Sequence, residues 1–405
     1  MRTFGLLLIC FLSLDAMTLE RFVDTSLSRH PSLLAIASRI AAADAAVRRA
    51  KNFDNPVLGL FVNDLPLNDL TDRRIEPMQT QGVTIAQKIP GFGKREAKEA
   101  VALARKGLQG LKLQEARTLL ETSIVQEAWR LWELTKLFDI TEKTLRLTRQ
   151  KVDLFTAYTA SSDTPSAHTA LMSAELVVSR LKIALAKIEG QIEASKARLR
   201  YLGDVQGELP KLTMPKHDLP ALAKLLERID RSPTLQVQKG ATHLQAKRLD
   251  AVKLSTRLNP VVKAGYNHRS AFEDYLSISV GVALPIYGTE TSRIEQNRAL
   301  LMAKRSETVD LRKKLSAKVE NLWYRAKAQA DIIEILQRKS LPEIDHMFEL
   351  MASRIQAGGD LYRFVDLLEQ KFRLEAKLIV AIAAKERTIA TIESIVPQKR
   401  NTEGP

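Results

Sequence analysis

The chain has 405 residues, of which 27% are charged and only 5% aromatic, and its formal net charge is +15. This composition, rich in Ala, Leu, Glu, Lys and Arg, is typical of long helices. The cations alternate with Glu and Asp along helical stretches without a zinc-finger, basic-zipper or stacking-aromatic pattern, which argues against nucleic-acid binding.

The first segment has the pattern of a secretory signal peptide. Arg2 precedes an apolar run that is too short to span a bilayer as a helix. Residues 1–16 are therefore predicted to be cleaved after Ala16, with a buried N-terminal helix as the alternative. The only cysteine, Cys10, would be removed as well, so no thiol would remain for disulfides, catalysis or metal binding. A lipid anchor on Cys10 is disfavoured, because Ile9 stands where a small residue is expected.

After this segment the same order of elements is predicted twice. Each copy opens with a helix that starts at a proline, Pro31 or Pro233, whose missing N–H costs nothing in the first turn. Asn55 and Asn259 each precede a proline, which disfavours the α region, so a strand is expected to follow. The predicted segments are a first structural repeat at 17–205, a linker at 206–220, a second repeat at 221–396 and a C-terminal tail at 397–405.

Two strands are expected in each copy, and the last has two different faces. In residues 275–284 the even positions are Leu, Ile or Val, and the odd ones after Tyr275 are Ser, Gly or Ala. A steeply tilted strand of this length just crosses a bilayer, with one face toward lipid and the other toward a watery lumen. Packing against a soluble partner sheet is the alternative reading of the same alternation.

Four such strands cannot close a barrel in lipid, because an open edge would leave backbone groups unpaired in hydrocarbon. Oligomerisation is therefore required. Three chains would supply twelve strands, an even number in the range of closed membrane barrels.

The longest predicted elements are helices that form hairpins. Residues 94–158 contain no proline and would form a rod of roughly 100 Å as one helix. A turn at 161–165 would lead into the returning helix. The second copy is expected to repeat this with a helix at 292–339, a break at Pro342 and a hairpin turn at 357–360. Apolar residues spaced by three and four predict packing of helix on helix.

This order of elements, present twice behind a signal peptide, resembles the TolC-type outer-membrane efflux family over essentially the whole mature chain. Segments 55–63 and 87–95 resemble strand segments of the CzcC- and CusC-like branch that serves heavy-metal efflux, and 341–369 is similar to the family's tip hairpin. The resemblance implies a mainly α fold, with a long coiled-coil α-barrel and four strands per protomer that form a twelve-stranded membrane β-barrel in the trimer. It also implies location in the cell outer membrane with a large periplasmic portion.

The resemblance further implies a passive export duct for metal ions or small molecules, without catalytic, cofactor or metal sites. Its expected partners are two further copies of the chain, outer-membrane lipid, a periplasmic adaptor (membrane fusion) protein and an inner-membrane efflux pump. A soluble coiled-coil scaffold with basic helices is the alternative function. Fractionation and circular dichroism would separate the two, because a scaffold would be soluble and almost purely helical.

Several residues receive roles from the resemblance. Asp366 and Glu369 match acidic positions of the periplasmic gate, where three copies around one axis would favour cations; ordinary solvated carboxylates on a helix are the alternative. Apart from the resemblance, Tyr275 and Tyr287 bracket the clearest strand and are expected at the membrane interfaces, with packing under loops as the alternative. The candidates for adaptor docking at the two tip turns are Ser161, Asp163, Gly358, Gly359 and Asp360.

Overall fold

The computed structural model describes residues 17–65, 67, 70–71, 77–91, 93–159, 165–355 and 361–397. The predicted mainly α fold with a small four-stranded sheet is confirmed. Two further strands of two residues each, which the sequence did not predict, form a separate parallel pair. The proposed signal peptide, Ser161, Asp163 and residues 358–360 lie outside the described residues.

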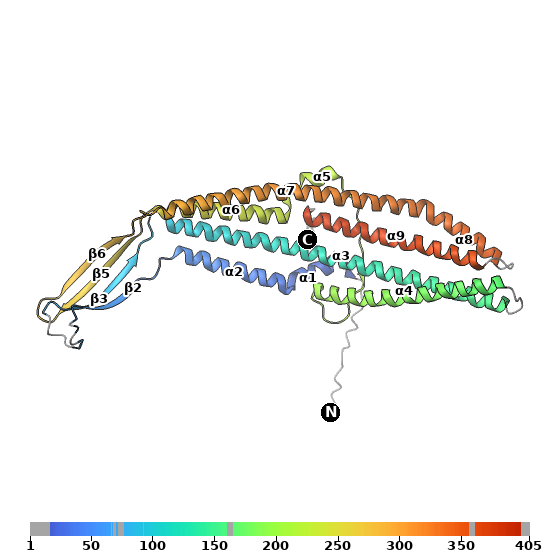
Figure 1. Cartoon of the computed structure of the whole chain (residues 1–405), viewed down its shortest axis with the longest axis horizontal. Coiled ribbons are helices and arrows are strands. Elements are labelled where there is room, and N and C mark those ends of the chain that lie inside the picture. Colours follow the sequence, from blue (N-terminus) through green and yellow to red (C-terminus); the bar gives the residue numbers. More distant parts are fainter. Residues whose placement is uncertain are drawn as a thin grey trace, which may run out of the picture. The chain divides into compact units, whose positions relative to one another are not determined.

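Figure 1 labels the elements along the chain. In chain order they are β1 (Met17–Thr18), α1 (Leu19–Arg29), α2 (Pro31–Lys51), β2 (Val57–Asn63), β3 (Thr80–Lys88), α3 (Lys94–Thr159), α4 (Pro165–Gly203), β4 (Leu212–Thr213), α5 (Leu222–Glu227), η1 (Ile229–Arg231), α6 (Pro233–Lys253), η2 (Leu254–Thr256), β5 (Pro260–Arg269), β6 (Tyr275–Val282), α7 (Thr289–Ile335), η3 (Leu336–Ser340), α8 (Leu341–Ile355) and α9 (Leu361–Ile395). Helices α2 and α6 begin at the two prolines that the sequence indicated. Within the described residues, none of the helices combines the length and the apolar character needed to cross a membrane.

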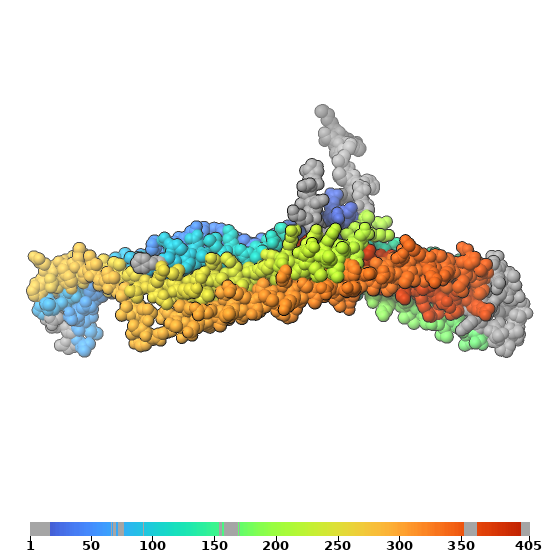
Figure 2. Space-filling view, turned by 90° about the horizontal axis from the view of Figure 1, so that it is seen from above, coloured from blue at the N-terminus to red at the C-terminus, as the bar shows by residue number. Residues whose placement is uncertain are grey.

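The chain folds into two compact units, and each takes segments from both halves of the sequence. One unit comprises Met1–Leu34, Glu115–Pro233 and Lys313–Pro405, and the other comprises Ala35–Gln114 and Thr234–Arg312. In the second unit α3 and α6 are in contact, because a Cβ on Gly240 would lie 2.7 Å from a methyl group of Leu111. Figure 2 shows cyan and yellow surfaces side by side in this unit, which come from opposite halves of the chain.

The second unit contains the sheet, whose strand order is β2-β3-β5-β6 with every pair antiparallel. The turn from β3 into α3 is fixed by the second Asn-Pro step, because the side chain of Asn259 accepts a hydrogen bond from the N–H of Gly91 at 3.2 Å. A Cβ on Gly91 would lie 2.1 Å from the carbonyl oxygen of Leu258, so only glycine fits. The first strand pair and the second are thereby tied at the end of the sheet that leads into the helices.

The first unit is a packing of long helices. Leu145 on α3, Val177 and Leu181 on α4 and Val365 on α9 belong to one buried cluster, at the three- and four-residue spacing expected for facing helices. Polar contacts add to it: the hydroxyl of Ser195 donates to Glu127 at 2.7 Å. These contacts give α3, α4 and α9 a common core.

The predicted helix at 292–339 differs from the structure at its end. The α-helix α7 stops at Ile335, and the chain continues through the π-turn η3 directly into α8. The N–H of Leu341 donates to the carbonyl of Leu336, five residues back. Pro342 lies in the first turn of α8, where its missing N–H is tolerated. The proline therefore changes the hydrogen-bond pattern and does not break the helical path.

Candidate functional site

The register of the sheet brings apolar side chains from all four strands onto one face. Leu60, Val83, Tyr266 and Leu276 are direct neighbours across the sheet. The apolar residues of this face are Leu58, Leu60, Val62, Val83, Ile85, Pro260, Val262, Ala264, Tyr266, Leu276, Ile278, Val280 and Val282, and the register also places Gln81, Gln87 and His268 on it. The side chains are not covered within the chain, since Leu60 is 81% exposed and Ile278 is 78% exposed. An exposed apolar patch of this kind marks a surface that contacts a partner or a membrane.

The opposite face of the sheet carries small and polar residues. One row across it consists of Gly59, Thr84, Gly265 and Ser277. The amide of Asn267, which is buried on this face, donates to the hydroxyl of Ser277 at 3.1 Å. The full polar face consists of Val57, Gly59, Phe61, Asn63, Thr80, Gly82, Thr84, Ala86, Lys88, Val261, Lys263, Gly265, Asn267, Arg269, Tyr275, Ser277, Ser279 and Gly281.

The polar face is the more enclosed of the two. A Cβ on Gly82 would lie 2.2 Å from the carbonyl oxygen of Tyr266 and 2.7 Å from the ring of Phe61. Gly265 on this face is buried, whereas its apolar-face neighbour Ala264 is exposed. Backbone and side chains therefore approach each other closely on this face, and position 82 has no room for a Cβ.

Both edges of the sheet are open in the described chain. Strand β2 pairs only with β3, and β6 pairs only with β5, so the outer side of each edge strand has no backbone partner among the described strands. The two edge strands are seven and eight residues long. Long apolar edges are templates for pairing with another chain, and natural sheets usually cover or charge them.

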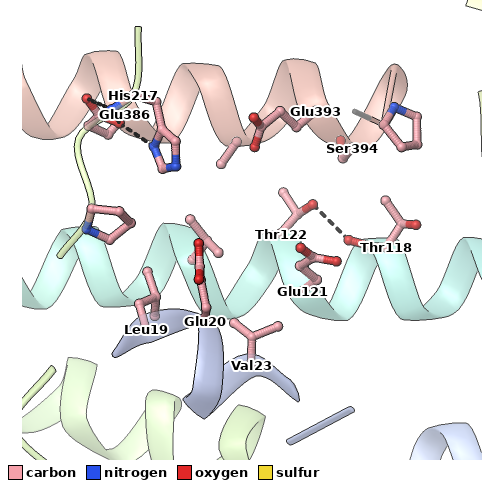
Figure 3. Close-up of a pocket in the computed structure, with 14 residues that line it drawn as sticks. Leu19, Glu20, Val23, Thr118, Glu121, Thr122, His217, Glu386, Glu393 and Ser394 are labelled. Atoms are coloured by element: carbon pink, nitrogen blue, oxygen red, sulfur yellow. Dashed lines mark hydrogen bonds and ion pairs between the residues drawn. The ribbon is translucent and has the colours of Figure 1, made fainter. Parts of the chain in front are cut away.

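A cavity of about 490 Å³ lies in the first unit, lined by α1, α3, the segment at Pro215 and His217, and α9 (Figure 3). The ring nitrogen Nδ1 of His217 lies 2.9 Å from the carboxylate of buried Glu386. The ammonium of Lys385 donates to the carbonyl of His217 at 2.7 Å. Glu20, Glu121 and Glu393 also line this cavity.

The two groups shift each other's pKa. The hydrogen bond to Glu386 raises the pKa of His217 above its ordinary value of 6.5, and burial opposes this only in part. Burial raises the pKa of Glu386. The hydrogen bond from His217 and the charge of Lys385 together lower it by more, so the net shift of the pKa is downward. Sequence reasoning missed this contact, because no short-range spacing connects a linker residue to α9.

The two gate candidates have different surroundings on α9. Asp366 is exposed and accepts a hydrogen bond from the amide of Gln370 at 2.8 Å. Glu369 is less exposed and forms ion pairs with Arg180 of α4 at 3.6 Å and with Arg373 at 3.1 Å. Asp366 is therefore the more available of the two carboxylates for a neighbouring chain.

The two interface tyrosines are also placed differently. Tyr275 opens β6 on the polar face, and the guanidinium of Arg269 lies 4.9 Å from the centre of its ring. Tyr287 lies beyond the end of β6 and is 90% exposed. The docking candidates at the tip turns fall outside the described residues, so their role stays a prediction.

No family model matches the sequence, and neither does any curated protein. The structure is similar to that of CusC, which was solved in a study of folding and transmembrane channel formation, with 14% identity over 94% of this chain and 92% of that chain and a TM-score of 0.78. It is similar to the outer-membrane channel OprN (16% identity, 95% and 90%, TM-score 0.77) and to the open MtrE outer membrane channel of Neisseria gonorrhoeae (13% identity, 93% and 88%, TM-score 0.77). This chain has the fold of these channel proteins.

Proposed function

We propose that the chain is a member of the TolC-type family and one of three identical subunits of an outer-membrane channel. The channel is a passive duct through which cargo leaves the cell, without a catalytic step. The observation that carries this proposal is the sheet with one exposed apolar face, one polar face and two open edges. The fold shared with solved outer-membrane channels supports it.

The physical argument concerns what the sheet needs in order to be stable. Its apolar face is stabilised by lipid, because transfer of apolar surface out of water is favourable. Its open edges cannot remain unpaired in hydrocarbon, where an unsatisfied backbone group costs several kcal/mol. Pairing of β6 of one chain with β2 of the next satisfies both edges, and three chains close a ring of twelve strands.

In this proposal the long helices form the periplasmic part of the duct, and an adaptor protein at their tips connects it to an inner-membrane pump. The cargo is metal ions or small molecules, and the likeness to CusC together with segments 55–63 and 87–95 supports the heavy-metal branch. Asp366 and Glu369 form the gate; Asp366 is the more exposed of the two, whereas Glu369 is engaged by Arg180.

The two faces of β6 allow a direct test with one substitution at two adjacent positions. Val280 lies on the apolar face and Gly281 on the polar face, where an added Cβ meets no atom within 4 Å. Val280→Lys would place an ammonium in lipid, at a cost that is about 2 to 4 kcal/mol at the midplane and smaller toward the end of the sheet, whereas Gly281→Lys would face the lumen. We expect Val280→Lys to reduce the trimer in detergent-extracted outer membrane severalfold and Gly281→Lys to leave it nearly unchanged.

The alternative function gives the opposite result in the same experiment. In a soluble scaffold both positions would face water, so both lysines would be tolerated equally and the protein would stay in the soluble fraction. Equal trimer yields for the two variants, or a soluble monomer for the unaltered chain, would rule out the proposed channel.

A further inference from the structure

We propose that the polar face of the sheet makes the membrane part of the duct cationic, so that it favours cargo with net negative charge. This inference rests on the proposed function, because it takes the polar face as the lumen wall. It specifies the charge of the cargo, which the likeness to other channels leaves open.

Every Lys and Arg residue of the four strands lies on the polar face. The strands contain Lys88, Lys263 and Arg269 and no Asp or Glu. The register assigns all three to that face, since Lys88 is opposite Val261, Lys263 is opposite Ala86 and Arg269 is opposite Thr80. The cations come from both halves of the chain, and the fold brings them to the same surface.

Lys88 and Lys263 form a belt near the end of the sheet that leads into the helices. They lie on neighbouring strands and two register positions apart, which places their Cα atoms roughly 8 Å from each other. The cross-strand neighbours of Lys263 are Ala86 and Ser279, so small side chains surround it. Both lysines are exposed, and neither is in an ion pair with a described residue.

The positive charge continues where the sheet meets the helices. The ammonium of Lys94 donates to the carbonyl groups of Ser255, at 3.3 Å, and Arg257. Burial, followed by the charges of Lys88 and Arg257, lowers the pKa of Lys94 below its ordinary value of 10.5, and only Glu290 acts in the opposite direction. The groups that influence Lys94 are therefore mostly cations.

At the other end of the sheet Arg269 stays on the polar face, where its guanidinium lies over the rings of Phe272 and Tyr275. The carboxylate of Asp274 lies nearby and accepts from Tyr266, from His268 at 2.8 Å and from the backbone N–H of Arg269 at 3.3 Å. It offsets part of the charge of Arg269, so Lys88 and Lys263 contribute most of the positive charge of the polar face.

In a closed ring of three chains these residues supply three cations from each chain to one narrow aqueous space. Rings of Lys and Arg favour anions in pores, since the field of a single sign is focused by low-dielectric walls. The cargo class that fits is a solute with carboxylate, phosphate or other oxyanion groups, including a metal carried as an anionic complex. A free divalent metal cation would meet a repulsive potential in this part of the duct.

The test is the reversal potential of the purified trimer in a planar lipid bilayer with a potassium chloride gradient. The variants are charge-removing, charge-keeping and charge-inverting changes at the same two positions: Lys88→Gln with Lys263→Gln, Lys88→Arg with Lys263→Arg, and Lys88→Glu with Lys263→Glu. We expect the Arg pair to have the same reversal potential as the unaltered channel, because the charge of the sheet is kept while the acidic gate is the same in all variants. The Gln pair should shift the reversal potential toward potassium, and the Glu pair should shift it further in the same direction.

The outcomes separate this inference from the proposed function. Channels that open with a reversal potential equal in the Gln, Arg and Glu pairs would overturn the cationic lumen while leaving the channel intact. Absence of trimers and of conductance in the unaltered protein would overturn the channel itself, and the inference with it. Trimer yield is measured for each variant, so that a selectivity change is read only from assembled protein.

Discussion

The contact between His217 and Glu386 joins the segment before α5 to the C-terminal helix. The carboxylate is almost fully buried, at 2% exposure, and it accepts from both the ring and the backbone N–H of His217. A buried carboxylate needs such partners, because burial of an unpaired charge costs several kcal/mol. The histidine side chain is 38% exposed, so solvent screens part of the interaction.

This contact predicts a pH dependence of stability. The pKa of His217 is raised, so its contribution is complete below 6.5 and is lost as the pH rises through the raised value. The pKa of Glu386 is lowered, so its contribution is present above 4.5 and is lost as the pH falls through the lowered value. Stabilisation is therefore largest between these limits.

The measurement is the free energy of unfolding at pH 5.5 and pH 8.5 for the unaltered chain and for His217→Gln. We expect the variant to be less stable by about 1 kcal/mol at the lower pH, and by clearly less at the higher pH. His243→Gln serves as the control, because that histidine is not part of this contact. A deficit of His217→Gln that is the same at both pH values would contradict the charged contact.

The two gate candidates, Asp366 and Glu369, give a second prediction at this scale. Asp366→Ala together with Glu369→Ala should raise single-channel conductance. The change removes a ring of like charges from the constriction, and with it the electrostatic barrier to anions. Asp366→Ala alone should produce most of the increase, since Glu369 is neutralised within its own chain by Arg180 and Arg373. Glu343→Ala, at an exposed carboxylate in the first turn of α8, is the control. Unchanged conductance and ion preference in the double variant would refute the gate.

At the scale of the elements, glycines on the polar face allow close packing across the sheet. Gly82 and Gly281 both lie on that face, but they differ in what an added methyl group would meet. At Gly82 the Cβ would be 2.2 Å from a backbone oxygen, and at Gly281 it would meet nothing within 4 Å. Substitutions at these two positions therefore distinguish the effect of steric crowding at a glycine from the effect of its backbone flexibility.

We expect Gly82→Ala to destabilise the folded protein by about 1 to 3 kcal/mol, because the backbone of β5 has to move. Gly281→Ala should be neutral or stabilising by a few tenths of a kcal/mol, through reduced freedom of the unfolded chain. Denaturant unfolding of the detergent-solubilised trimer, followed by circular dichroism, measures both. Equal effects at the two sites would show that crowding on the polar face is unimportant.

The elements themselves were largely predictable from local rules. Pro31 and Pro233 start helices, each Asn-Pro step is followed by a strand, and the proline-free stretch from Lys94 forms one helix to Thr159. These signals succeed because proline and the residue before it have few backbone options. The π-turn before Pro342 was not predictable, because a helix can accommodate a proline by ending, by bending or by changing its hydrogen-bond spacing.

At the scale of the whole molecule, pairing between distant segments decides what sequence reasoning could not. The alternation in β6 was enough to predict its two faces, whereas the cationic belt required the pairing of β3 with β5. The same holds for His217 and Glu386, which no periodicity relates. A single sequence gives the period of each strand, but the register between two strands depends on the folded chain.

The open edges of β2 and β6 link the stability of the proposed channel to the concentration of protein. In the proposed channel, part of each subunit's backbone hydrogen bonding is supplied only after association, so the folded state of the sheet would be governed by mass action. Its apparent resistance to heat or detergent must rise with the amount of protein present, and dilution alone weakens it. A newly made subunit also presents two unpaired edges and an apolar surface until it meets its neighbours. Because such surfaces promote aggregation, rapid assembly protects the subunit better than a long life as a monomer.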